Sequence, residues 1–386
     1  MDKIEELLTR GVANIIPGRV ELEKLLKSGK KLNIYMGVDP TATKIHLGNA
    51  VGLRKLQAFA DLGHNVTFLI GDFTALIGDT SDKDAERPSL TSKEIEENFL
   101  TYKKQAEKIL DFSKVKVKYN SEWLKKLNFE EILKLNQHFS ANDFLSRELI
   151  KKRLSEGKRI GLHEFSYPVM QGYDSYFLDT DIQIGGTDQT FNMQAGRTLQ
   201  KDLRHKESFV LTTPILEGPD GRKMSKSYGN AIWLDDNQND MYAKTMAVED
   251  KFIINYFTLA TNISLEKIKT YEERLKSENP INIKKELAHV IVTELHDKES
   301  ADGAQENFES TVQNKELPEE VEILNASVLE DLIKAGMVSS RSELKRLIEQ
   351  EGIKINDKTI GDIDVKLKEG DVLRIGKRRV VKISSK

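Results

Sequence analysis

The sequence predicts an α/β protein that begins with a parallel sheet and continues into a helical region and a small terminal module. Residues 32–38 and 66–70 are apolar runs typical of buried strands, and residues 47–62 between them carry apolar side chains at helical spacing. A strand, a helix and a strand within about forty residues form a right-handed parallel βαβ unit. The chain has 386 residues, which is more than one compact core normally takes, so two to three domains are expected.

The composition is that of an ordinary globular protein and excludes several classes of function. It contains 38% hydrophobic and 31% charged residues, and its net charge of −3 excludes a polycation that binds nucleic acid along its whole length. Without cysteine there are no disulfides, iron–sulfur clusters or thiolate zinc sites. The acidic start lacks the apolar core of a signal peptide, and no apolar run approaches the ~20 residues that span a bilayer, so we expect a cytoplasmic protein without membrane contact.

The first strand leads into a polar loop that is a candidate nucleotide site. Short helices at 4–8 and 20–26 precede it, and Gly63 ends the helix that follows it. His46 and Asn49 project from one face of the first helical turn, and Gly48 leaves room for a flat group against the backbone. Helix N-termini beside strand ends favour phosphate. A His that only makes a local hydrogen bond fits this pattern equally well.

The middle of the chain is predicted as an insertion between two halves of the sheet, over about residues 83–160. A Gly-rich segment ending at Asp79 and a polar loop at 82–89 precede it. A long helix at 92–112, an edge strand at 115–119, and helices at 124–135 and 143–154 follow.

A second polar constellation lies between residues 164 and 189. If the chain is helical after Pro168, then Tyr167, Gln171 and Asp174 share one face, and the apolar residues around them favour burial over a solvated stripe. A short strand then leads through Gly185 and Gly186 to a helix that Thr187 or Asp188 can cap. This layout repeats the first one, which favours a nucleotide site.

The last strand, at 209–212, leads to a loop with two lysines and neighbouring hydroxyls. Lys223, Ser225 and Lys226 lie in a segment with little apolar content, so we expect a mobile loop that can close over a polyphosphate. The alternative is a solvated basic surface.

The remaining chain is predicted as a helical bundle, a linker and a basic module. Helices are expected at 241–248, 251–260, 265–275 and 283–295, with a linker at 305–322. In the tail, Arg341, Lys345 and Arg346 lie at helical spacing, and residues 377–379 are all basic. Such faces suit a phosphate backbone, although a solvated surface would look similar.

Two motifs together identify a family. His46-Leu47-Gly48-Asn49 resembles the HIGH motif, and residues 223–227 read KMSKS, so the chain resembles class I aminoacyl-tRNA synthetases. Further residues resemble tyrosyl-tRNA synthetase, namely Tyr35, Gly37, Asp39, Thr41, Tyr167, Gln171, Asp174 and the run 185–189. The tail resembles the RNA-binding domain of small-subunit ribosomal protein four. Asn49 departs from the second His that the family usually has, and it cannot carry a proton charge.

The resemblance implies a fold, a reaction and a set of site residues. It implies a Rossmann-like catalytic domain at 1–230, an α-helical anticodon-recognition domain with linker at 231–320, and an α+β RNA-binding domain at 321–386. Tyrosine would react with ATP to give tyrosyl-adenylate and pyrophosphate, and the tyrosyl group would pass to the 3′ end of tRNA(Tyr). Magnesium would arrive with ATP, so no dedicated metal site is expected in the protein. The resemblance also implies a homodimer.

The resemblance also divides the site residues between the substrates. Catalytic roles at the phosphates fall to His46, Asn49, Thr41, Lys223 and Lys226. ATP would further contact Gly37, Asp39, Gly48, Gly185, Gly186 and Ser225. Tyr35 and Asp174 would bind the phenol hydroxyl of tyrosine, while Tyr167, Gln171 and Asp79 would bind its ammonium group. Gln189 would lie near that group, and Gln183, with Asp39, near the carboxylate and ribose.

Three alternative functions remain at this point. Tryptophanyl-tRNA synthetase shares the fold, but the Tyr35 and Asp174 pair and the terminal module argue against it. A small-molecule nucleotidyltransferase would lack the helical bundle and the tail. A non-catalytic RNA-binding relative would not need the intact lysine loop.

Overall fold

The chain forms two compact units, Met1–Asp302 and Gly303–Lys386. The computed structural model describes residues 2–40, 43–77, 92–313, 322–338, 340–356, 358–376 and 379–384. The predictions for Thr41, Asp79, the loop at 82–89 and the basic residues 377–378 lie outside the described residues. The predicted domain boundaries stay a prediction.

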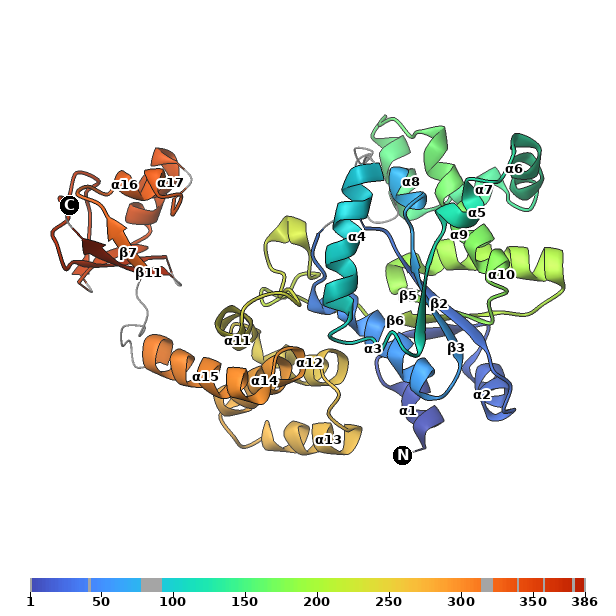
Figure 1. Cartoon of the computed structure of the whole chain (residues 1–386), viewed down its shortest axis with the longest axis horizontal. Helices are drawn as coiled ribbons and strands as arrows, with labels where there is room; N and C mark the ends of the chain where they lie inside the picture. Colours follow the sequence, from blue (N-terminus) through green and yellow to red (C-terminus); the bar gives the residue numbers. More distant parts are fainter. Residues whose placement is uncertain are drawn as a thin grey trace. The chain divides into compact units, whose positions relative to one another are not determined.

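A six-stranded sheet organises the first unit (Figure 1). Its order is β1-β6-β5-β2-β3-β4, and all neighbouring strands are parallel except β1 and β6. The strands are β1 (Asn14–Ile16), β2 (Asn33–Val38), β3 (Asn65–Ile70), β4 (Val115–Tyr119), β5 (Ile182–Gly186) and β6 (Phe209–Thr213). The predicted parallel sheet is confirmed, as is the edge position of β4. Strand β1 was not predicted, because three residues pairing with a strand far along the chain leave no local pattern.

The direction of the crossovers locates the place where the sheet can hold a ligand. From β2 the chain passes through α3 (Leu47–Asp61) to β3, on one side in the strand order. From β5 it passes through α10 (Thr190–Arg204) to β6, on the other side. Since both crossovers are right-handed, α3 and α10 cover opposite faces of the sheet (Figure 1). The order therefore reverses between β2 and β5, and ligands bind at the carboxyl ends of strands at such a point.

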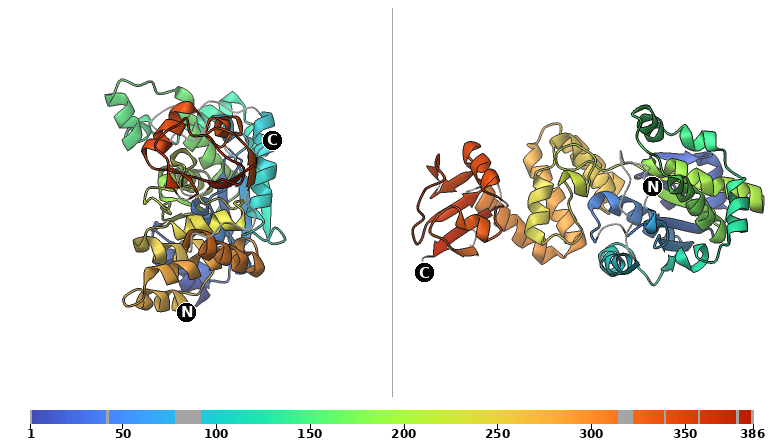
Figure 2. Two further views of the ribbon diagram at one scale, coloured as in Figure 1. Left: turned by 90° about the vertical axis from the view of Figure 1, so that its left-hand side faces the viewer. Right: turned by 90° about the horizontal axis from the view of Figure 1, so that it is seen from above.

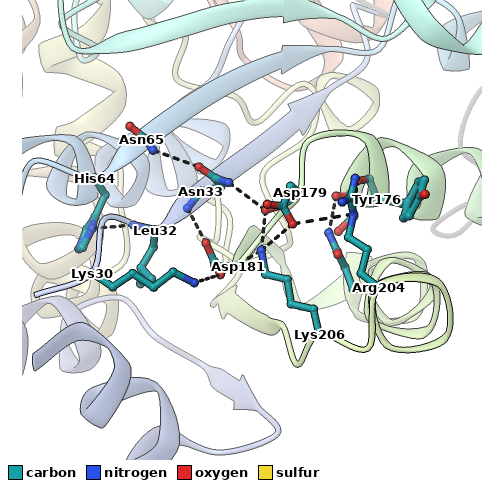
Figure 3. A network of polar contacts seen from close by, with 12 residues as sticks. Lys30, Leu32, Asn33, His64, Asn65, Tyr176, Asp179, Asp181, Arg204 and Lys206 are labelled. Carbon is teal, nitrogen blue, oxygen red and sulfur yellow. Dashed lines mark hydrogen bonds and ion pairs between the residues drawn. The ribbon is translucent and has the colours of Figure 1, made fainter. Parts of the chain in front are cut away.

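A polar network joins the opposite, amino ends of the strands (Figure 3). The buried Asp181 carboxylate, just before β5, accepts from the backbone N–H of Asn33 at 2.8 Å and pairs with Lys30 and Lys206. Asn33 in turn accepts from Asn65 at the start of β3, at 3.1 Å. The network fixes the starts of β2, β3 and β5 relative to one another. The carboxyl ends of these strands, at the opposite edge, remain available for a ligand.

The block between β3 and β5 is more divided than predicted. It contains α4 (Ser92–Ala106), then β4, which belongs to the main sheet, and then α5 (Ser121–Leu124), α6 (Phe129–Asn136), α7 (Ala141–Leu145) and α8 (Glu148–Ser155). The prediction of two continuous helices at 124–135 and 143–154 is wrong. Asn128 caps a new helix, α6, inside the first range, and the second range is divided between α7 and α8 at Ser146 and Arg147. Helix α9 (Leu162–Phe177) begins before Pro168 rather than after it.

Two short helices flank the strand β1 at the start of the chain, and a helical region follows the last strand of the sheet. The early helices are α1 (Lys3–Thr9) and α2 (Arg19–Lys27). Figure 2 shows the later ones together in yellow to orange: α11 (Gln238–Met246), α12 (Ile253–Ala260), α13 (Leu265–Arg274) and α14 (Pro280–Leu295). Helix α15 (Lys298–Phe308), which crosses the boundary between the two units, replaces the start of the predicted linker. Its buried residues Ala301 and Ala304 are small, and its one large apolar residue, Phe308, is the last, so the apolar pattern is weak. Within the described ranges, no helix has the length and apolar character needed to cross a membrane.

The second unit has its own sheet and core. The order is β7-β11-β10-β8-β9, built from β7 (Glu322–Asn325), β8 (Ile353–Ile355), β9 (Lys358–Thr359), β10 (Val372–Ile375) and β11 (Arg379–Ser384), with the helices α16 (Asp331–Lys334) and α17 (Arg341–Glu349). Leu344 and Ile348 of α17 lie in the core, while Arg341, Lys345 and Arg346 are exposed. The predicted basic helix face is present, although Arg341 pairs with Glu330 and Arg346 with Glu343.

Candidate active site

One cavity of about 300 Å³ lies at the carboxyl ends of β2 and β5. Most of the described residues that the sequence predicts as site residues line it, although they come from five separate segments. They are Tyr35, Gly37, Asp39, His46, Gly48, Asn49, Tyr167, Gln171, Asp174, Gln183, Gly185, Gly186, Gln189 and Lys223. Of the described candidates, Ser225 and Lys226 do not line it.

Asp174 is a buried carboxyl group in the wall of the cavity. It is 3% exposed, and its two oxygens accept hydrogen bonds from the indole N–H of Trp123 at 2.7 Å and the amide of Asn120 at 3.1 Å. Burial raises the pKa of Asp174 to about 8, although these two donors oppose the rise. The carboxyl group is therefore held in a fixed orientation. It exchanges its proton near pH 8 rather than near pH 4.

Tyr35 presents a second oxygen on the same wall. Its hydroxyl donates to Gln183 Oε1 at 3.1 Å, and Gln183 donates from Nε2 to the carbonyl of Met193 at 2.9 Å. Burial, and next the charge of Asp174, raise the pKa of Tyr35 well above its usual range. Gln183 thus sits behind the Tyr35 hydroxyl, and both ends of its amide contact the protein. Such a neutral phenol can donate and accept hydrogen bonds beside Asp174.

Asp39 and Tyr167 form a polar group in the middle of the cavity. Asp39 follows the end of β2, where its oxygens accept from the hydroxyl of Tyr167 at 2.9 Å and of Thr74 at 2.7 Å. Tyr167, Gln171 and Asp174 all reach the cavity from α9, so the predicted shared face of this helix is confirmed.

His46 caps helix α3 and is a neutral hydrogen-bond donor. Its Nδ1 accepts from the backbone N–H of Asn49 at 3.2 Å, and the Asn49 side chain accepts from the backbone N–H of His46 at 3.3 Å. This capping box leaves the ring proton on Nε2. Burial, and then the charge of Lys223, lower the pKa of His46 to about 4. A side chain at position 48 would lie 3.0 Å from His46 Nδ1, so Gly48 makes room for the imidazole itself.

The two lysines of the loop occupy different environments. The ammonium of Lys223 lies in the cavity wall, 3.0 Å from Asp188 Oδ2, whereas Lys226 is exposed in a short 3₁₀ turn, Lys226–Tyr228. The Ser225 hydroxyl caps that turn. Met224, between the two lysines, is buried, so one apolar side chain does hold this segment, while the expected mobility of the loop stays a prediction.

Several site residues were not predicted. Asn120 and Trp123 reach Asp174 from the end of β4 and from α5, and Thr74 reaches Asp39 from the turn after β3. No short motif marks these residues. Asp188 could have been found, since it lies in the Gly-Gly-Thr-Asp-Gln run that supplies three predicted residues, Gly185, Gly186 and Gln189. In the structure Thr187–Gln189 forms a 3₁₀ turn, and neither Thr187 nor Asp188 caps the following helix as predicted.

The cavity has two chemically different ends. At one, Tyr35 and Asp174 offer a hydroxyl and a carboxyl group to a hydrogen-bonding ligand. At the other, the N-terminus of α3, His46, Asn49 and Lys223 offer donors and positive charge, which favour a polyphosphate. Among the described residues, no group of three or more His, Asp or Glu side chains gathers to hold a metal ion.

Comparisons with known proteins agree with this arrangement. The family model of class I tRNA synthetases (W and Y) matches residues 27–313, and the S4 domain matches residues 329–373. The chain is 43% identical to a tyrosine–tRNA ligase of Carboxydothermus hydrogenoformans, over 98% of this chain and 97% of that protein. It is 42% identical to the tyrosine–tRNA ligase of Thermotoga maritima, over 98% and 96%.

Solved structures agree as well. A truncated mitochondrial tyrosyl-tRNA synthetase of Coccidioides posadasii is 26% identical and has a TM-score of 0.65, covering 79% of this chain and 91% of that one. The tyrosyl-tRNA synthetase of Archaeoglobus fulgidus in complex with L-tyrosine is 25% identical and has a TM-score of 0.62, covering 79% and 100%. The chain therefore belongs to the class I tRNA synthetases, within their bacterial-type tyrosine–tRNA ligase family.

Proposed function

We propose that this chain activates L-tyrosine with ATP and transfers the tyrosyl group to the 3′ end of tRNA(Tyr). The observation that carries this proposal is that one cavity joins a hydroxyl-reading end to a phosphate-binding end. The family charges tRNA(Tyr) with tyrosine, and a related solved structure was determined with L-tyrosine.

At the amino-acid end, Asp174 and Tyr35 recognise the phenol hydroxyl of tyrosine. Trp123 and Asn120 fix the Asp174 carboxyl group, so that its orientation does not change when the ligand arrives. Phenylalanine offers these groups no hydroxyl, so the hydrogen-bonding capacity of Asp174 and Tyr35 that Trp123, Asn120 and Gln183 leave unused would be buried unsatisfied, at a cost of about 1–3 kcal/mol. Tyr167 and Gln171, and by family resemblance Asp79, bind the ammonium group, with Gln189 nearby.

At the other end, the chain stabilises charge that develops on the phosphates of ATP. A carboxylate oxygen of tyrosine forms a bond to the α-phosphorus, the bond from that phosphorus to the bridging oxygen of the β-phosphate breaks, and pyrophosphate leaves with the electron pair. The reaction needs no protein nucleophile, so alignment and electrostatic stabilisation provide the catalysis. His46 donates from Nε2, Asn49 from its amide and Lys223 from its ammonium group, while by resemblance Thr41 assists and Lys226 enters when the loop closes.

Magnesium is assigned to ATP rather than to the protein. Mg²⁺ commonly binds through substrate phosphates and keeps several waters. The described residues form no cluster of three or more carboxylate or His side chains that could hold it.

We further propose that tRNA contacts the helical region and the second unit, and that the partner of this chain is a second copy. The S4 domain and the exposed basic side chains of α17 support the RNA contact.

The proposed dimer rests on exposed apolar surface. Large apolar side chains are exposed on the block between β4 and β5, among them Phe129, Ile132, Leu133, Leu145 and Leu162. Phe129 is 75% exposed. Light scattering tests the dimer: Phe129→Asp should give a monomer, and an unchanged mass would refute this interface.

Exchange of labelled pyrophosphate into ATP, with each amino acid in turn, tests the proposed function. Tyrosine should stimulate exchange, and phenylalanine should do so far less. Exchange that responds to tryptophan instead would favour the tryptophanyl reaction. A folded protein whose exchange tyrosine does not stimulate would contradict the proposal.

A further inference from the structure

Asn230 follows the lysine loop, and its side chain holds the front half of that loop together. It is 9% exposed. Its Oδ1 accepts from the backbone N–H of Ser225 at 2.9 Å, and its Nδ2 donates to Asp220 Oδ1 at 2.7 Å. The same nitrogen lies 3.2 Å from the carbonyl oxygen of Lys223 and 3.4 Å from that of Arg222. One amide therefore contacts the turn and the second strand of the hairpin that carries Lys223, residues 217–223.

The backbone is shaped to admit this amide. Glu217 pairs with Lys223 as an isolated β-bridge, and the N–H of Gly218 donates to the carbonyl of Arg222 at 2.7 Å. A β-carbon on Gly218 would lie 2.5 Å from Asn230 Nδ2. Only glycine therefore lets the hairpin approach Asn230 this closely.

The chain after Asn230 is fixed to the N-terminus of α3. The backbone N–H of Leu47 donates to the carbonyl of Ile232 at 2.9 Å, and that of Leu234 donates to Ile45 at 2.8 Å. Ile232 and Leu234 are fully buried. His46 lies between the two bonded positions, so Asn230 links the hairpin of Lys223 to the segment that pairs with His46.

We propose that Asn230 is a positioning residue of the ATP site, which holds Lys223 at a fixed place relative to His46. The proposal rests on the function given above, in which both groups act on the phosphates of ATP. This role of Asn230 divides the loop into a fixed part and a moving part. Lys223 is preset beside Asp188, and the exposed segment 226–229, between the anchored Ser225 and Asn230, is the part that moves to bring in Lys226.

Asn230→Ala releases the carbonyl of Lys223 and the N–H of Ser225 together. A misplacement of about 1 Å at a reacting centre can cost about 10²-fold in rate, so we expect kcat for tyrosine-dependent pyrophosphate exchange to fall about 10- to 100-fold. The KM for tyrosine should stay within about twofold, because α9 and β2 form that end of the cavity. The matched control is Asn237→Ala, which removes the cap of α11 outside the loop and should leave kcat unchanged.

A double-mutant cycle separates positioning from a general loss of stability. If Asn230 acts through Lys223, then Lys223→Ala with Asn230→Ala should be no slower than Lys223→Ala alone, within about twofold. Two losses that multiply would overturn the proposal, and so would full activity of Asn230→Ala in a wild type that exchanges normally. A wild type without tyrosine-dependent exchange would instead overturn the proposed function itself.

A charge exchange provides a second test if the alanine variant does not fold. Asn230→Asp keeps the acceptor for Ser225 but places a carboxylate against Asp220 and the two carbonyls, so kcat should fall. Adding Asp220→Asn restores a donor–acceptor pair and should recover about tenfold in kcat. No recovery in a folded double variant would contradict the proposed geometry.

Discussion

Replacing His46 by alanine should slow adenylate formation by an amount that does not depend on pH between 6 and 8. In the structure His46 Nδ1 accepts from the N–H of Asn49 at 3.2 Å, and burial together with Lys223 lowers the pKa of His46 to about 4. The imidazole is therefore neutral throughout that range. Its contribution is one Nε2–H donor to a phosphate oxygen rather than a charge or a base.

The size of the effect follows from that single donor. A hydrogen bond to a charged group contributes about 1.5–3 kcal/mol, and each 1.4 kcal/mol corresponds to about tenfold in rate. The value of kcat/KM for ATP should therefore fall about 10- to 150-fold in His46→Ala. His46→Asn is the matched control for the helix cap, because Asn is a good N-cap but too short to place a donor where Nε2 lies. It should keep the thermal stability of the wild type and lose the rate.

Pyrophosphate exchange measured from pH 5.5 to 8.5 checks this reasoning. The wild-type and His46→Ala profiles should run parallel. If instead the wild type shows a rate step near pH 6.5 that vanishes in His46→Ala, then the imidazole titrates in the working range, and the neutral-donor account is refuted.

Three further predictions follow from the same geometry. The folded chain holds the Asp174 proton between about pH 4 and 8, where the unfolded chain releases it, so the free energy of unfolding falls as the pH rises through this window. Asp174→Asn should flatten that fall in urea titrations and reduce the preference for tyrosine over phenylalanine; an unchanged preference would remove Asp174 from recognition. Lys226→Ala should slow the burst of tyrosyl-adenylate far more than it weakens tyrosine binding, and an unchanged burst would refute its role. Deleting residues 321–386 should spare adenylate formation but impair charging of tRNA(Tyr); equal charging would exclude the tail from the mechanism.

The parts of the fold that were predicted are those with a strong local pattern. Strands β2 and β3 are apolar runs, and α3 between them has apolar residues at helical spacing, so their type and pairing follow from the sequence. Strand β1 and helix α15 were missed because long-range pairing in one case and buried alanines in the other replace a visible apolar pattern.

The candidate site divides in the same way. Tyr167, Gln171 and Asp174 could be grouped because helical spacing places them on one face of α9. Trp123 and Asn120 could not, because they reach Asp174 from other elements.

The sequence motif likewise does not show that Lys223 and Lys226 lie in different environments. Only the contact of Lys223 with Asp188, and the anchoring of its hairpin by Asn230, separate a lysine in the cavity from one outside it.

A structure of the chain with tyrosine and a non-hydrolysable ATP analogue tests the division of the cavity most directly. The phenol hydroxyl should lie within hydrogen-bond distance of Asp174 and Tyr35, and the phosphates should contact His46 Nε2 and the ammonium of Lys223. A tyrosine ring bound beside His46, or phosphates bound beside Asp174, would contradict the account.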